Sequence, residues 1–304
     1  MENIQQLIQS FKMGDAKALA RCITIVENEL EGHSDILASL TFTKNTPLIG
    51  ITGPPGAGKS TLVNAVISVL LKQNKKIGIV AIDPTSPFNY GSLLGDRLRM
   101  SEHFNNDSIF IRSLATRGSL GGLSAKTIEI TDVMRAFGFD YVFVETVGVG
   151  QSEVEIAGLA DTTVLVLVPE SGDEVQTIKS GIMEIADIFV VNKADRAGAD
   201  LFAKNLKSSI ISKSDWEIPI LKTIASQHEG VETLVSAIEK HYQRGITNEK
   251  KYFLLAEKAY KLIQFQRMKS VSKEILQKKI AEKMKASDFN LYRFVADFML
   301  NNKN

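Results

Sequence analysis

The chain has 304 residues, of which 44% are hydrophobic and 23% charged, and its formal net charge is +1. This composition excludes a disordered, collagen-like or disulfide-rich protein, and the balanced charge lacks the basic excess of nucleic-acid and anionic-membrane binders. Cys22 is the single cysteine, so no intrachain disulfide can form. The amino terminus is polar and no apolar stretch is long enough to span a bilayer, which favours a reducing cytoplasm or organelle matrix. We expect a cytoplasmic protein that binds neither nucleic acid nor membrane.

Residues 1–45 are expected to form an amino-terminal helical segment. Apolar side chains recur at helical spacing over residues 4–11 and again over residues 16–30. Asp15 lies just before the second run and suits a helix N-cap. The Gly-His-Ser stretch at 32–34 is expected to form a loop.

Residues 46–245 alternate short apolar runs with helical segments. The runs are rich in Val and Ile at consecutive positions, which is typical of parallel strands buried on both faces. The alternation predicts an α/β domain with a doubly wound, mainly parallel sheet. The expected strands are Pro47–Thr52, Ile77–Ile82, Ile109–Ser113, Tyr141–Glu145, Thr163–Val168, Ile188–Asn192 and Ile218–Lys222, and helices are expected at Ser60–Gln73, Ala125–Phe137 and Thr177–Ala186.

Residues 246–304 show no strand pattern and are expected to form a carboxy-terminal helical arm. Phe253, Ala256, Tyr260 and Ile263 mark one apolar stripe at helical spacing. Basic residues outnumber acidic ones here, and a solvated helix face and a basic docking surface both account for that excess.

The motif GPPGAGKS, at residues 53–60, fits the P-loop pattern G-x-x-x-x-G-K-[ST] and lies between an expected strand and an expected helix. Glycines let successive backbone N–H groups point at phosphate oxygens, and the helix N-terminus adds partial positive charge. In this pattern Lys59 reaches the β- and γ-phosphates and Ser60 ligates Mg²⁺. The nucleotide-binding residues predicted here are Gly53, Pro54, Pro55, Gly56, Ala57, Gly58, Lys59, Ser60 and Thr61.

Two later segments predict the choice of base. Asn192-Lys193-Ala194-Asp195 follows an apolar strand and fits the N-K-x-D element of GTPases. Asp195 would accept hydrogen bonds from guanine N1–H and the 2-amino group, whereas adenine would leave the carboxylate unpaired at a cost of about 1.5–3 kcal/mol. Lys193 would pack along the base, and Asn192 would tie this segment to the P-loop. The run Thr223, Ile224 and Ala225 lies where GTPases place a second base-contacting loop; an ordinary polar loop after a strand is the alternative for both segments.

Acidic residues at expected strand ends are candidates for the metal and the γ-phosphate. Asp83 and Glu145 each end an apolar run, and a carboxylate at the carboxyl end of a parallel strand beside the P-loop can reach Mg²⁺ or its water shell. Glu145 and Gly148 stand where other GTPases have D-x-x-G, so the Gly148 N–H is expected to contact the γ-phosphate. An ordinary strand-end cap is the alternative for either acid.

Several longer strings resemble the methylmalonyl-CoA mutase-associated GTPases, the MeaB/ArgK type within the SIMIBI class of P-loop GTPases. The most specific are ETVGVGQSE at residues 145–153 and IMEIAD at residues 182–187. The match covers roughly residues 12 to 235 and also includes Ala81–Pro87, Leu94–Asp96, Arg99-Met100, Gly172–Gln176 and Lys179–Gly181.

The resemblance implies a GTP-hydrolysing chaperone for an adenosylcobalamin-dependent acyl-CoA mutase, which couples hydrolysis to cofactor loading and to protection of the mutase. It also implies a homodimer with the helical arm in the contact, and a segment carrying Lys179 that responds to nucleotide and partner. By motif position it makes Asp83, Asp96 and Glu145 the acidic set. The predicted catalytic residues are then Lys59, Asp96 and Glu145, and the predicted metal ligands are Ser60, Asp83, Asp96 and Glu145.

Two other functions use the same core motifs. A nickel-insertion GTPase of the same class needs cysteine or histidine ligands near its nucleotide-sensing loops or a His-rich tail, but here Cys22 lies in the amino-terminal helices and the four histidines are scattered. A P-loop kinase would use the same lysine and Mg²⁺ set with a different phosphoryl acceptor, and the N-K-x-D element argues against ATP.

Overall fold

The computed structural model describes residues 3–83, 103, 106–115, 125–146, 156–171, 182–210, 216–245, 248–268, 271–284 and 289–301. The chain divides into two compact units, Met1–Lys258 and Ala259–Asn304. None of the helices within these described ranges is long and apolar enough to cross a membrane.

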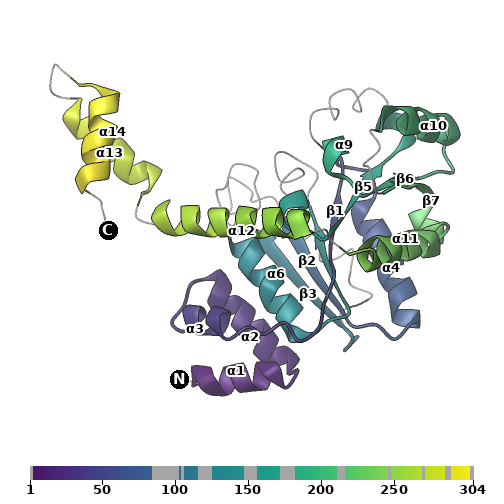
Figure 1. Cartoon of the computed structure of the whole chain (residues 1–304), viewed down its shortest axis with the longest axis horizontal. Coiled ribbons are helices and arrows are strands. Elements are labelled where there is room, and N and C mark those ends of the chain that lie inside the picture. The colour runs from purple at the N-terminus through teal and green to yellow at the C-terminus, as the bar shows by residue number, and fades with distance from the viewer. Residues whose placement is uncertain are drawn as a thin grey trace. The chain divides into compact units, whose positions relative to one another are not determined.

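A seven-stranded sheet forms the centre of the first unit, in the order β3-β2-β4-β1-β5-β6-β7 (Figure 1). Every neighbouring pair is parallel, which confirms the predicted doubly wound fold. The order reverses at β1, so the carboxyl end of β1 lies at the switch point where such sheets bind ligands. The strands are β1 (Leu48–Thr52), β2 (Ile77–Asp83), β3 (Ile109–Ala115), β4 (Tyr141–Glu145), β5 (Thr162–Leu167), β6 (Ile188–Asn192) and β7 (Ile220–Thr223).

Both faces of the sheet are covered because its strands carry apolar side chains at consecutive positions. On β5, Val164 and Val166 pack in the core under α4 (Lys59–Lys72) and α11 (Val231–Gln243). Their neighbours Leu165 and Leu167 pack in a second core on the opposite face; α9 (Ile182–Ile185) and α10 (Ala199–Ser209) supply its helical side chains. Each fully buried aliphatic side chain contributes about 1.5–3 kcal/mol to folding, so this two-sided burial is a large part of the driving force.

The helix α6 (Ala125–Phe137) matches its predicted bounds, and α9 covers the described part of the helix expected over residues 177–186 up to Ile185. Residues 177–181 lie outside the described part of the chain, and α9 ends at Ile185.

Three helices precede the sheet: α1 (Ile4–Lys12), α2 (Ala16–Glu27) and α3 (His33–Ala38). Asp15 caps α2 as predicted, because its carboxylate accepts the Lys17 N–H at 2.7 Å. The loop expected at residues 32–34 is wrong, since α3 begins at His33. Gly32 takes a left-handed conformation that starts this helix, and Ile36 then becomes buried, a tertiary contact that a local pattern cannot show.

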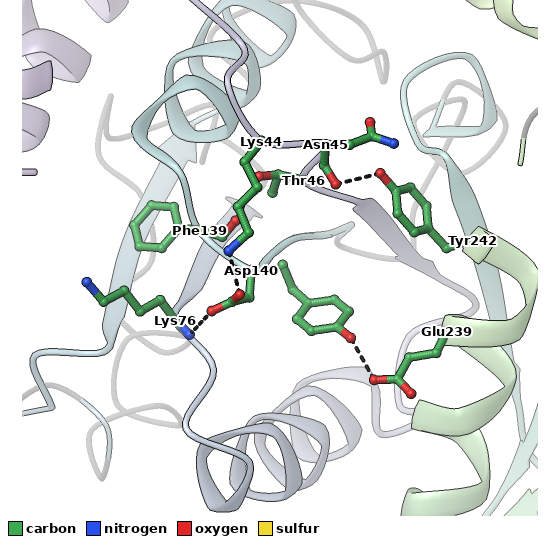
Figure 2. A network of polar contacts seen from close by, with 9 residues as sticks. Lys44, Asn45, Thr46, Lys76, Phe139, Asp140, Glu239 and Tyr242 are labelled. Atoms are coloured by element: carbon green, nitrogen blue, oxygen red, sulfur yellow. Dashed lines mark hydrogen bonds and ion pairs between the residues drawn. The ribbon is translucent and has the colours of Figure 1, made fainter.

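The segment that leads into β1 is held at the amino end of the sheet (Figure 2). Lys44 Nζ lies 2.5 Å from an Asp140 carboxylate oxygen, and the other Asp140 oxygen accepts the Lys76 N–H at 2.7 Å. The Tyr242 hydroxyl donates to the Asn45 carbonyl at 2.6 Å. Burial and a nearby carboxylate raise the pKa of Tyr242 to about 12, so this hydroxyl stays a protonated donor at neutral pH.

The second unit contains the end of α12 (Asn248–Met268), together with α13 (Lys273–Lys283) and α14 (Leu291–Asn301). Phe294 and Phe298 of α14 are buried, and Lys279 of α13 lies over the Phe298 ring at 4.9 Å. The adjoining face of α14 exposes large apolar side chains, and Tyr260 and Ile263 of the predicted α12 stripe are exposed as well. The exposed residues of α14 are Leu291, Tyr292, Val295, Met299 and Leu300.

Candidate nucleotide site

The P-loop connects the end of β1 to the start of α4, at the carboxyl edge of the sheet. Two of its glycines are required by close approach as well as by backbone conformation. Gly53 has φ +140°, and a Cβ there would lie 2.1 Å from the Val166 carbonyl oxygen; Gly58 has φ +85°, and its Cβ would lie 2.5 Å from Asn192 Nδ2. Side chains at these positions would displace the loop from the strands that support it.

Lys59 is the first residue of α4, and its ammonium turns back into the loop. The side chain is buried, and Nζ donates to the Gly53 carbonyl at 2.8 Å and to the Pro54 carbonyl at 3.0 Å. A buried ammonium at a helix N-terminus makes this edge of the sheet strongly attractive to phosphate.

Ser60 and Glu145 meet beside the P-loop although 85 residues separate them. The Ser60 hydroxyl donates to Glu145 Oε1 at 2.6 Å, and both side chains are buried. Glu145 ends β4, whose pairing with β1 aligns it with Ile51. Hydroxyl and carboxylate oxygens are hard donors of the kind Mg²⁺ takes, so the residues present fit a magnesium ion at this position.

Asn192 joins the N-K-x-D segment, residues 192–195 and here called the guanine segment, to the P-loop. Its Nδ2 donates to the Ala57 carbonyl at 2.9 Å, and its Oδ1 accepts the Thr223 hydroxyl at 3.1 Å and the Ala225 N–H at 3.2 Å. The two predicted base-contacting segments and the P-loop therefore form one hydrogen-bonded unit around a buried side chain. In this unit the Thr223 hydroxyl contacts Asn192, a role that the sequence motif did not indicate.

The residue after Asn192, Lys193, also contacts the P-loop. Lys193 adopts a positive φ of 53°, and its ammonium donates to the Gly56 carbonyl at 2.8 Å. Asp195 is exposed, as a side chain that must reach a base has to be. On the same edge Thr61 is exposed on α4 and Ile224 is half-buried after β7.

Part of the predicted acidic set is not placed. Asp83 is the last residue of β2, at the same edge of the sheet, and its side chain lies outside the description. Asp96, Gly148 and Lys179 lie outside the described residues. The structure therefore brings together the P-loop, Glu145, the guanine segment and the segment after β7.

A second contact that the sequence did not predict lies between two threonines next to these motifs. The Thr146 hydroxyl donates to the Thr52 hydroxyl at 3.1 Å. Thr52 directly precedes the P-loop and Thr146 directly follows Glu145. No motif marks the pair, because the two residues are adjacent only through the register of β1 and β4.

A parallel sheet with a P-loop at its switch point and an N-K-x-D segment tied to that loop defines a P-loop GTPase. The family model for methylmalonyl Co-A mutase-associated GTPase MeaB matches residues 19–285, and the chain belongs to this family. It is a GTPase that binds guanine nucleotide.

Similar proteins agree with this assignment. A putative GTPase of Pyrococcus abyssi is 50% identical over 245 residues, which cover 78% of this chain and 76% of that protein. A methylmalonic aciduria type A homolog of Caenorhabditis elegans, described as mitochondrial, is 38% identical over 218 residues, 66% of this chain and 54% of that protein. The crystal structure of a LAO/AO transport system kinase superimposes with a TM-score of 0.69 at 23% identity, covering 98% of this chain and 97% of that one, and shows the same fold.

Proposed function

We propose that this GTPase is a chaperone of an adenosylcobalamin-dependent acyl-CoA mutase, in which GTP hydrolysis is coupled to cofactor loading and to protection or reactivation of the mutase. The observation that carries the proposal is the match over residues 19–285 to a family described as mutase-associated. A relative named for methylmalonic aciduria supports the same partner class. The proposed compartment is the cytoplasm.

The proposed chemistry follows from the carboxyl edge of the sheet. Lys59 and the P-loop amides bind the phosphates, and Asp195, three residues after the anchored Asn192, selects guanine. Ser60 and Glu145 would hold Mg²⁺, together with Asp83 and Asp96. The ion, when bound, neutralises charge on the phosphate oxygens. Glu145 is the proposed catalytic carboxylate, and Lys59 and Asp96 are the other two proposed catalytic residues.

The proposed assembly is a homodimer that uses the carboxy-terminal arm of residues 246–304. The exposed row on α14 supports it, because Leu291, Val295 and Met299 follow one another at intervals of four residues and share one helix face. Monomeric soluble proteins rarely expose contiguous apolar faces of this kind.

Pull-down from cell extract tests the partner. The tagged chain, bound to a non-hydrolysable GTP analogue, is expected to retain a cobalamin-dependent acyl-CoA mutase that mass spectrometry identifies. The matched control is Lys59→Ala, which removes the phosphate-binding ammonium and is expected to lose nucleotide-dependent capture. Retention of no mutase by the unmutated chain, with purified mutase also failing to bind, would contradict the proposed chaperone function and leave the GTPase activity untouched.

A further inference from the structure

The Thr52–Thr146 hydroxyl pair adjoins the proposed magnesium site along the chain, since Thr52 directly precedes the P-loop and Thr146 directly follows Glu145. Both side chains are buried, with 0% and 1% of their surface exposed. The Thr146 N–H donates to the Ile51 carbonyl at 3.1 Å, which extends the contact between β1 and β4 by one residue beyond β4. Among the described residues, the hydroxyl bond is the last link between these two strands before the chain continues into the P-loop after Thr52.

The Thr52–Thr146 bond is important because it adjoins the proposed catalytic carboxylate of Glu145. Glu145 is one residue before Thr146, and its carboxylate accepts from Ser60 at 2.6 Å. On β1, Thr52 also pairs with Leu165 of β5, so the residue that accepts from Thr146 is itself fixed from the other side. A displacement of about 1 Å of a catalytic group can cost up to about 100-fold in rate, so holding the residue after Glu145 matters more than its modest bond energy indicates.

We infer that Thr146, through its hydroxyl bond to Thr52, is a positioning residue that holds Glu145 in register with Ser60 for magnesium-dependent GTP hydrolysis. This inference rests on the roles proposed above for Ser60 and Glu145. Thr146 contacts neither phosphate nor metal in this account; it acts through the backbone of the preceding residue.

Thr146→Val keeps the shape of the side chain and removes the hydroxyl. The loss of one hydrogen bond is expected to lower kcat for GTP about fivefold and to raise the half-saturating Mg²⁺ concentration by a similar factor. GDP affinity measured in EDTA is expected to stay within about twofold, because the P-loop contacts remain. Thr146→Ser restores the hydroxyl and is expected to recover kcat to within about twofold.

Two further variants test whether the pair acts as a unit. Thr52→Val is expected to change kcat and the Mg²⁺ requirement in the same direction. The double Val variant is expected to be no worse than Thr146→Val, because Thr146→Val already removes the bond to Thr52 together with the 3.5 Å contact between the Thr146 hydroxyl and the Ile51 carbonyl. Thr46→Val is the matched control: it removes a buried threonine hydroxyl bond of 2.7 Å, to the Phe139 carbonyl, at the opposite end of β1. It is expected to lower the unfolding midpoint without changing kcat or the Mg²⁺ requirement.

The inference is overturned if Thr146→Val has the parental kcat and Mg²⁺ requirement, or if Thr46→Val lowers kcat as much as Thr146→Val does. Glu145→Gln, assayed in parallel, distinguishes failure of the proposed role of Glu145 from failure of the positioning role of Thr146. Loss of hydrolysis in Glu145→Gln with normal Thr146→Val overturns the positioning role alone. Parental hydrolysis in Glu145→Gln removes the proposed role of Glu145 and the positioning role together.

Discussion

At the residue scale, the guanine segment shows how one buried amide organises several backbones. Asn192 is 2% exposed and bonds to Ala57, Thr223 and Ala225, so each of its polar atoms is used inside the protein. Asp195, three residues later, is exposed. The rigid part of the segment therefore supports the loop, and the exposed carboxylate is the part free to recognise a base.

Asp195→Asn is expected to change base preference from guanine to xanthine. The amide donates a hydrogen bond to the 2-oxo group of xanthine but no longer accepts from the 2-amino group of guanine, and a mispaired charged hydrogen bond costs about 1.5–3 kcal/mol. Competition binding with GTP, XTP and ATP measures the change. Asp200→Asn on α10, an exposed aspartate paired with Lys222, is the control and should leave preference unaltered. Equal affinity of the parent for GTP and ATP would refute the assignment.

Glu145→Gln is expected to retain most nucleotide binding and to lose about 100-fold in kcat, since charge at this position is needed most in the transition state. Single-turnover GTP hydrolysis at saturating Mg²⁺ gives the rate. The comparison variant is Glu239→Gln on α11, whose carboxylate accepts from Tyr141 at 2.7 Å at the opposite end of β4. A parental rate in Glu145→Gln would reduce Glu145 to a strand-end cap.

At the scale of elements, the segment before β1 is held partly by the ion pair between Lys44 and Asp140. Burial of Asp140 opposes its ionisation, but the Lys44 ammonium and the Lys76 N–H outweigh it, so the pKa of this carboxyl lies below its usual range. A lowered pKa in the folded state means that the contribution to stability is complete above the unfolded-state pKa near 4 and is lost as pH falls through the folded-state value.

Asp140→Asn is therefore expected to destabilise the chain at pH 7 by about 0.5–1 kcal/mol, a figure kept small because the Lys44 ammonium is half-exposed. The difference from the parent should shrink as pH is lowered below about 4. Urea unfolding at pH 7 and at acidic pH gives both free energies. Asp107→Asn, at an exposed turn, should show no such pH-dependent difference, and a pH-independent effect of Asp140→Asn would contradict the charge argument.

At the scale of the whole molecule, the arm presents the clearest testable surface. Val295 and Met299 are 49% and 65% exposed on one face of α14, while Phe294 and Phe298 are buried on the adjoining face. The pattern is that of a helix with two apolar faces, of which one packs within its own unit. The proposed homodimer supplies a partner for the second face.

The double variant Val295→Asp/Met299→Asp is expected to convert a dimer into a monomer, because two charges would be buried in an apolar contact. Light scattering coupled to gel filtration gives the mass, and circular dichroism shows whether the helices remain. Lys278→Asp on α13 carries a comparable change of charge outside this row and should leave the mass unchanged. A monomeric parent would remove the proposed dimer.

Much of this molecule can be predicted from the sequence because the signals are local. Consecutive apolar residues at 164–168 and 188–191 are enough to indicate strands buried on both faces. The P-loop and N-K-x-D patterns carry their chemistry within eight and four neighbouring residues. The Asp15 cap was predictable for the same reason, because a carboxylate bonds to N–H groups two residues away.

Only the tertiary structure decided which residues distant in the sequence come into contact, because strand register and packing bring them together. Ser60 meets Glu145 across 85 positions and Thr146 meets Thr52 across 94, and both contacts exist only because β1 pairs with β4 in one register. The start of α3 and the exposure of the α14 row depend likewise on what each face packs against. A sequence pattern reports the preference of a segment for helix or strand, but which side chains become neighbours is set by the free energy of the whole core.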